Sequence, residues 1–199
     1  MAQDQIEDAL RRPARYWMDD GIVEIMMGLF ALLVGLAACC QAHLLVVLAV
    51  LLASPFLLRS IPVFKRHLTF PRTGYIAPRR PGMFVRRVIP VAGVVVTSLV
   101  FWLWPAADLS RFDTVIPLAL GVVLGFLFWR AGLSLGLARF CALGCIIAAA
   151  GTVVALMRLP LRFAVGALFV VEGSAFVVSG LIVLCIYLKA HPKPVGEEQ

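Results

Sequence analysis

Six long apolar segments constrain the fold of this chain more than any other feature. Each is about 15 to 25 residues long, and about 20 apolar residues in a helix cross a hydrocarbon layer of about 30 Å. The chain has 199 residues, of which 62% are hydrophobic and 15% are charged. A soluble domain of this size cannot bury so much apolar surface in one core. The sequence therefore predicts an all-α fold, a polytopic transmembrane helical bundle of about six spans.

The N-terminal segment differs from the rest in being polar. Residues 1–20 carry acidic and basic groups, and Tyr16 and Trp17 are typical of a membrane interface. We expect a short amphipathic helix that lies on the membrane surface. Asp19 or Asp20 is expected to cap the first transmembrane helix, because aspartate accepts hydrogen bonds from the free N–H groups of a helix start.

A single transmembrane domain is expected over residues 21–188, followed by a tail at residues 189–199. Because the second span is short and contains Ser54 and Pro55, a kinked or partly inserted helix is the alternative there. The expected spans are residues 21–40, 44–58, 88–104, 114–130, 137–157 and 163–188, with a basic loop at residues 59–87.

The distribution of Lys and Arg predicts the orientation. Fifteen of the eighteen lie in the two terminal segments, in loop 59–87 and around the connection between the fourth and fifth spans. The remaining three, which fall on the other side, are Arg111, Arg158 and Arg162. Because basic connections stay in the cytoplasm, we expect both termini and loop 59–87 to be cytoplasmic.

One processing signal is an alternative for the first span. Leu36–Cys39 has the form of a bacterial lipobox, which would make the first span a cleaved signal and Cys39 a lipidated N-terminus. Signal peptides begin with a positively charged segment. The tail before this span carries five acidic residues and three Arg, and Glu24 interrupts the apolar stretch. We therefore favour a first span that is retained.

Small residues mark a helix-packing face. Gly121 and Gly125 have Gly-x-x-x-Gly spacing in the fourth span, a pattern that lets another helix approach closely in lipid. We expect these glycines to meet a helix of the same chain or of a second copy. The five cysteines lack the C-x-x-C or Cys/His spacing of a zinc site, and we interpret them as small apolar packing residues.

Glu172 is the most informative polar residue. It lies about nine residues into the sixth span, or about 13 Å from the span's outer end at 1.5 Å per residue. Intramembrane acids usually face a bundle interior or a water-filled cavity. Thr97, Ser98 and Thr152 lie at a depth that would let them bind its carboxyl group. Two interpretations follow, a proton- or cation-coupling site and a buried polar contact between helices.

Glu24 lies about one turn into the first span. Arg130, Arg139 or the basic loop could neutralise it. A surface ion pair or a favourable charge at a helix N-terminus explains the residue simply. A role in ion coupling or gating is the alternative.

Loop 59–87 combines basic and aromatic residues with prolines that oppose a long helix. Juxtamembrane basic clusters attract anionic lipid headgroups. Lipid binding is therefore the expected role, and docking of a cytoplasmic partner or an anionic solute is the alternative. The candidate headgroup-binding residues are Lys65, Arg66, Arg72, Arg79, Arg80, Arg86 and Arg87.

Two short stretches carry a family resemblance. They are Tyr16-Trp17 with Asp20-Gly21 and Glu24, and the run Leu68-Thr69-Phe70-Pro71-Arg72-Thr73-Gly74-Tyr75. Together they resemble small bacterial multi-pass integral membrane proteins of unassigned activity. The resemblance implies a bacterial cytoplasmic (inner) membrane and assigns no functional residue.

Several classes of function are disfavoured by the sequence. A net charge of +7 without a basic face or a recognised fold motif gives no support for nucleic-acid binding. His43, His67 and His191 are scattered over loops, so we expect no metal and no cofactor. An enzyme would need acids, histidines or a reactive cysteine pair clustered at one depth, and the sequence shows no such cluster.

Two hypotheses for the function remain. The first is a non-enzymatic accessory or scaffold protein whose basic loop binds anionic lipid or a membrane-protein partner, as a monomer or a homo-oligomer. The second is a small proton- or cation-coupled transporter, or an oligomeric channel, that uses Glu172. A hydrated cavity at Glu172 would favour the second, and a dry helix interface the first.

Overall fold

The computed structural model describes residues 17–39, 56, 59–73 and 113–192, and all regular structure in these residues is helical. The predicted all-α fold is confirmed for this part of the chain. Four helices in it are long and apolar enough to cross a membrane. They are α2 (Ile22–Cys39), α6 (Val115–Leu135), α7 (Ala138–Leu156) and α8 (Leu161–Ala190).

These four helices overlap the first, fourth, fifth and sixth expected spans. The described residues thus hold four candidate spans, whereas six were expected over the whole chain. The expected span 88–104 lies outside these residues, and so does span 44–58 except for the helical residue Phe56.

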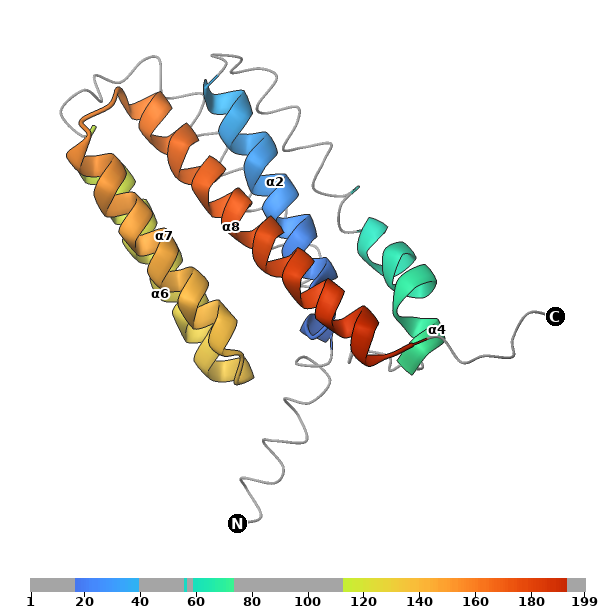
Figure 1. Ribbon diagram of the computed structural model, residues 1–199. Coiled ribbons are helices and arrows are strands. Elements are labelled where there is room, and N and C mark those ends of the chain that lie inside the picture. The colour runs from blue at the N-terminus through green and yellow to red at the C-terminus, as the bar shows by residue number, and fades with distance from the viewer. Residues whose placement is uncertain (1–16, 40–55, 57–58, 74–112, 193–199) are drawn as a thin grey trace, which may run out of the picture.

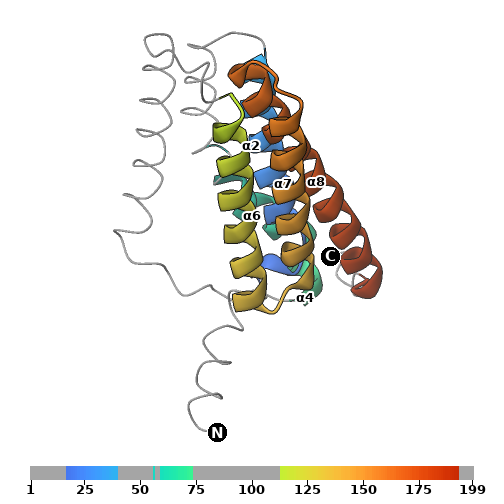
Figure 2. The same cartoon turned by 90° about the vertical axis from the view of Figure 1, so that its left-hand side faces the viewer.

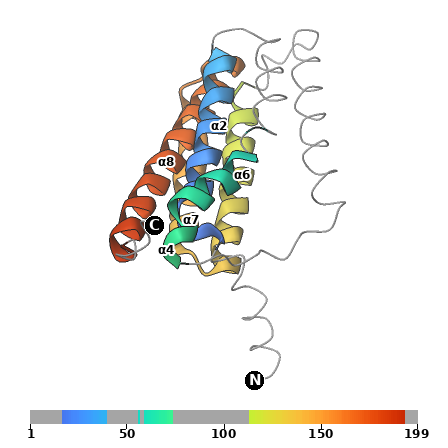
Figure 3. The ribbon, with the colours of Figure 1, turned by 90° about the vertical axis from the view of Figure 1, so that its right-hand side faces the viewer.

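The four long helices form two antiparallel pairs (Figure 1). Helix α2 packs along α8, and α6 packs along α7. Figure 2 shows α6 and α7 side by side, and Figure 3 shows α2 beside α8. Helix α7 also contacts α8, which brings the two pairs together into one bundle.

Gly136 ends α6 and makes the tight connection to α7. It adopts a left-handed conformation, with φ of 66°, that costs glycine little. The N–H of Leu137 then donates to the carbonyl of Gly132 at 2.9 Å, which closes the last turn. Helix α6 therefore continues past Arg130, where the sequence had suggested its end, because the first residue suited to stopping it lies further along.

Two aspartates cap helices in the bundle. The Asp20 Oδ1 atom accepts a hydrogen bond from the N–H of Ile22 at 3.2 Å, which confirms one of the two caps expected for the first span. At the other end of the bundle, Asp113 Oδ1 accepts from the N–H of Leu161 at 3.2 Å and so ties the start of α6 to the start of α8.

The first part of the basic loop is helical, contrary to our expectation. Residues 59–68 form a helical stretch, and α4 (Phe70–Thr73) follows it. Pro71 lies in the first turn of α4, where the missing N–H would have no helical partner. Figure 3 shows this segment, called the 59–73 segment below, beside α2 and α8.

The apolar core lies where α7 meets α8. Leu137, Phe140, Leu143 and Ile147 cluster around Phe176, which is 1% exposed. The Phe176 ring meets the edge of Phe128 from α6, with a centroid distance of 4.7 Å. Aromatic contacts of this kind add to the burial energy, so they help to hold the two helix pairs together.

Candidate functional site

Helices α2 and α8 touch along a seam of glycines. A Cβ atom on Gly28 would lie 2.7 Å from the carbonyl oxygen of Gly173, closer than side chains can approach. The same close approach recurs every seven residues along both helices. The facing pairs are Gly21 with Gly180, Gly28 with Gly173, and Gly35 with Gly166. Sequence reasoning missed this seam, although the seven-residue spacing is visible in both spans.

Helices α6 and α7 have a second seam of the same kind. A Cβ atom on Gly121 would lie 2.6 Å from the Cα of Gly151, and one on Gly125 would lie 2.6 Å from the carbonyl oxygen of Gly144. The structure therefore places both glycines of the predicted packing face against a helix of the same chain. In lipid, where apolar burial between helices contributes little, such backbone contact is a main source of helix association.

A polar cluster closes one end of the bundle. Its charged and hydroxyl side chains are Asp20, Glu24, Lys65, Arg139 and Ser179, and the end at which they lie is called the basic end below. These five side chains come from the start of α2, the 59–73 segment, α7 and α8. The cluster therefore joins both helix pairs and the basic segment.

Glu24 is the centre of the larger half of this cluster. Arg139 Nε donates to Glu24 Oε1 at 2.6 Å, and the Ser179 hydroxyl donates to Glu24 Oε2 at 2.8 Å. A second nitrogen of Arg139 donates to the Met18 carbonyl at 2.5 Å. Glu24 is fully buried. Our expectation of an arginine partner is met by Arg139, but the carboxylate is buried and the Arg139 side chain is 23% exposed, so this is not a surface ion pair.

Lys65 is the centre of the smaller half. Its Nζ donates to Asp20 Oδ2 at 2.5 Å and to the Trp17 carbonyl at 2.6 Å, and it lies 4.4 Å from the centre of the Trp17 ring. Burial lowers the pKa of the Lys65 amine below its ordinary value, and the Asp20 carboxylate opposes this shift. Lys65 is 2% exposed, so the prediction that it contacts lipid headgroups is wrong.

Arg72 also forms hydrogen bonds within the chain. One guanidinium nitrogen donates to the carbonyl of Leu188 at 3.1 Å and to that of His191 at 2.7 Å, which binds the 59–73 segment to the end of α8. Its Nε atom is buried without a hydrogen-bond partner. Of the three expected headgroup ligands in this segment, Arg66 alone is exposed. Arg79, Arg80, Arg86 and Arg87 lie outside the described residues.

Glu172 lies in α8, away from the polar cluster. It is 6% exposed, and its Oε2 atom is buried without a hydrogen-bond partner. Thr152, one of its expected partners, is exposed and donates its hydroxyl to the Ala148 carbonyl of its own helix at 2.9 Å. The other two, Thr97 and Ser98, lie outside the described residues.

Phe176 lies between Glu172 and the polar cluster along α8. It is one helical turn from Glu172 and almost one turn from Ser179, so the three residues lie near one face of the helix. Because Phe176 is buried among other aromatic rings, apolar side chains separate the two carboxyl groups. The described residues thus hold two separate polar sites on this face.

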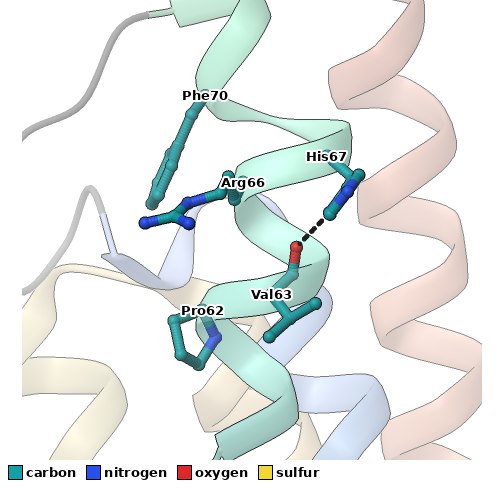
Figure 4. A pocket seen from close by; sticks show the side chains of 5 residues that line it. All are labelled: Pro62, Val63, Arg66, His67 and Phe70. Atoms are coloured by element: carbon teal, nitrogen blue, oxygen red, sulfur yellow. Dashed lines mark hydrogen bonds between the residues drawn. The ribbon is translucent and has the colours of Figure 1, made fainter.

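An open groove of about 530 Å³ runs along the 59–73 segment (Figure 4). The described residues that line it are Pro62, Val63, Arg66, His67 and Phe70. Figure 4 shows Pro62, Arg66 and Phe70 along one side of the helical stretch. His67 turns to another side, where its Nδ1 lies 2.9 Å from the Val63 carbonyl. The groove therefore combines apolar surface with two nitrogen-bearing side chains.

Metal-binding clusters of three or more His, Cys, Asp or Glu are absent from the part of the chain that the structure describes. Comparison with protein families found no match, and comparisons with curated proteins and with solved structures also found none. The glycine seams, the polar cluster, Glu172 and the groove are the features that point to a function.

Proposed function

We propose that this chain is a non-enzymatic accessory or scaffold protein of the membrane, with a basic cytoplasmic face that binds anionic lipid or a partner. The single observation that carries this proposal is the polar cluster at the basic end. Its buried acids, Asp20 and Glu24, are each paired with a cation from another segment. A cluster that is satisfied in this way favours one fixed arrangement of helices.

The glycine seams support the same proposal. In both pairs the backbones are in contact, so a helix cannot slide or rotate against its neighbour without a clash of main-chain atoms. Alternating access in transporters requires one group of helices to rock against another. Movement of one helix against the other within a pair is therefore disfavoured. A rocking movement would have to take place between the two pairs.

Chain connectivity supports the six crossings expected from the sequence. Cys39 and Asp113 lie at the end of the bundle opposite the basic end, since Cys39 meets Gly166 and Asp113 caps α8. Lys65 and Arg72 lie at the basic end. A chain that joins Cys39 to Lys65, and Arg72 to Asp113, must therefore cover the length of the bundle twice, which fits two crossings in addition to the four.

We further propose that the basic end faces the cytoplasm of a bacterial inner membrane, with both termini on that side. Lys65, Arg66, Arg72, Arg139 and Lys189 all lie near this end, which fits the preference of basic residues for the cytoplasm. The bacterial assignment rests on the family resemblance alone. Reporter fusions after His43, Pro71, Asp108, Ser134, Leu161 and Gln199 are expected to alternate between outside and inside, beginning outside. Fusions at His43 and Pro71 that report the same side would refute the second crossing.

A proton- or cation-coupled transporter is the second candidate, and one observation favours it. Glu172 is a buried acid whose Oε2 atom lacks a hydrogen-bond partner. Buried polar groups are usually paired, so an unpaired one is a place where a proton or cation could be exchanged.

Flux through purified protein in proteoliposomes separates the two candidates. Vesicles with an internal pH dye receive a pH gradient and, in separate runs, a Na⁺ or K⁺ gradient. The scaffold proposal expects wild-type flux equal to that of protein-free vesicles, and no change in Glu172→Gln. Flux that is present in the wild type and lost in Glu172→Gln, with the fold intact by circular dichroism, would overturn the scaffold and identify Glu172 as the coupling site.

A further inference from the structure

The groove on the 59–73 segment lies at a defined level of the bundle. Lys65 binds Asp20, which precedes the first turn of α2, whereas Arg72 binds the carbonyls of Leu188 and His191 at the end of α8. The segment thus runs from the level at which α2 begins toward the end of α8. Residues before Lys65 lie on the bilayer side of that level, and residues after it lie further out.

Along this direction, the groove is lined first by apolar side chains, then by Arg66 and His67, and then by Phe70. Pro62 and Val63 are apolar and lie about one turn to the bilayer side of Arg66 and His67. Phe70 follows one turn further out and is aligned with Arg66 in Figure 4. The apolar side chains thus lie on the bilayer side of the cationic or hydrogen-bonding groups. This order matches a molecule with a hydrocarbon chain and an anionic head.

Among the described residues that line the groove, Arg66 is the cation available to an external anion. Lys65 is paired with Asp20, and Arg72 is bound to two carbonyls, whereas Arg66 is exposed and makes no ion pair with another described residue. Acidic residues are absent from all of loop 59–87, so no carboxylate within the loop competes for Arg66. An Arg guanidinium binds phosphate oxygens through two parallel hydrogen bonds.

His67 also lines the groove but lies on another side of the helical stretch from Arg66. Its Nδ1 lies 2.9 Å from the Val63 carbonyl. A carbonyl accepts hydrogen bonds, so Nδ1 carries a proton and Nε2 of the neutral ring is an acceptor, which leaves the phosphate contact to Arg66. The groove volume of about 530 Å³ is within the usual range of small-molecule sites, about 300 to 1,000 Å³.

We infer that this groove is a binding site for one anionic phospholipid, whose phosphate is held by Arg66 and whose acyl chain lies on Pro62 and Val63. This inference rests on the proposed function, which assigns lipid or partner binding to the basic face, and it names the ligand class and the residues. Burial of Lys65 contributes indirectly, because the ion pair with Asp20 fixes the level of the segment relative to α2.

Lipid retention by purified protein tests the site. Protein in nanodiscs of phosphatidylglycerol and phosphatidylcholine is extracted into mild detergent, and the lipids that stay bound are counted by native mass spectrometry. We expect one phosphatidylglycerol per wild-type chain beyond the background, and about fivefold weaker retention in Arg66→Gln, the effect typical of one cation near an anionic surface. Val63→Thr, which keeps the shape but adds a hydroxyl, is expected to weaken retention as well.

The matched control is Arg130→Gln. Arg130 is also exposed and lies in α6 toward the basic end, so its removal changes the net charge equally without touching the groove. Equal losses in Arg66→Gln and Arg130→Gln would overturn the site and indicate general charge attraction. Equal retention of phosphatidylcholine, or displacement of the lipid by inorganic phosphate, would also overturn it. Unchanged thermal unfolding of Arg66→Gln confirms that the variant is folded.

The outcome is independent of the flux experiment. If the wild type carries protons, and Arg66→Gln loses the bound lipid, the scaffold proposal is refuted and the lipid site is kept. An inactive protein that binds no lipid at the groove would keep the scaffold and refute the site.

Discussion

The α2–α8 pair and the α6–α7 pair are built on the same contact but differ in charge. Both are held by glycines that bring two backbones together. Buried acids occur in the described part of the first pair, at Glu24 and Glu172, whereas the second pair contributes Arg139 to the polar cluster. The difference suggests two separate tasks: small residues hold each pair together, and complementary charges determine how one pair docks on the other.

Removal of the Arg139 charge, which joins the two helix pairs, should reduce the stability of the fold more than any other change considered. Arg139→Ala leaves the fully buried Glu24 without its cation, and breaking a buried pair from one side costs about 3–5 kcal/mol. We expect a marked fall in the thermal unfolding temperature in detergent. Arg130→Ala is the control, since Arg130 is exposed. Similar unfolding temperatures for the two variants would show that the charge does not join the pairs.

Enlarging a glycine should weaken one pair at a time. Gly28→Leu and Gly125→Leu each place a side chain against a main-chain carbonyl, and overpacking of this kind costs about 1–3 kcal/mol or more. Val122→Leu, on the exposed face of α6, is expected to be neutral. Cross-linking between cysteines placed on α2 and α8 should fall in Gly28→Leu but not in Gly125→Leu. If both variants lost it equally, the seams would not act separately.

Burial of Lys65 is expected to make the free energy of unfolding depend on pH. Desolvation lowers the pKa of the Lys65 amine in the folded chain below its ordinary value of 10.5. At a pH between the folded pKa and the unfolded pKa, the unfolded chain therefore binds more protons than the folded chain. The free energy of unfolding should therefore rise with pH through this window. We expect wild-type stability to increase relative to Lys65→Met as the pH approaches about 10.5. A difference that stays constant or falls would contradict the burial of the amine.

Glu172→Gln should change the free energy of unfolding least. The amide has the shape of the acid, and the carboxyl group has no hydrogen bond at Oε2 to lose. We expect a change in unfolding free energy below about 1 kcal/mol, measured by thermal or denaturant unfolding, because Glu172 forms no ion pair with another described residue. A large destabilisation would indicate that Glu172 holds a partner through its other oxygen and contributes to the docking of the pairs.

The apolar blocks made the helical part of the fold predictable. Hydropathy located α2, α6, α7 and α8 to within a few residues, because lipid imposes both the length and the composition of a span. The Gly-x-x-x-Gly pattern also pointed to the face of α6 that meets α7. The extension of α6 beyond Arg130 was missed because an apolar run does not show where a glycine will stop the helix.

The site was harder to predict because its contacts join residues far apart in the chain. Lys65 and Asp20 are 45 positions apart, and Arg139 and Glu24 are 115 positions apart. A basic cluster in sequence does not reveal which cation will be buried and which will stay exposed. Thr152 was expected to bind Glu172 on the basis of depth, but helix rotation decides direction, and its hydroxyl instead binds its own helix.

The central claim is that the Glu24–Arg139 contact joins the two helix pairs, and a double-mutant cycle measures it most directly. Unfolding free energies are determined for the wild type, Glu24→Gln, Arg139→Gln and the double variant, with Arg130→Gln in place of Arg139→Gln as the control cycle. Residues in direct contact couple by about 0.5–3 kcal/mol, so we predict coupling in that range for Glu24 with Arg139 and none for Glu24 with Arg130. Additive effects in the first cycle would contradict the account.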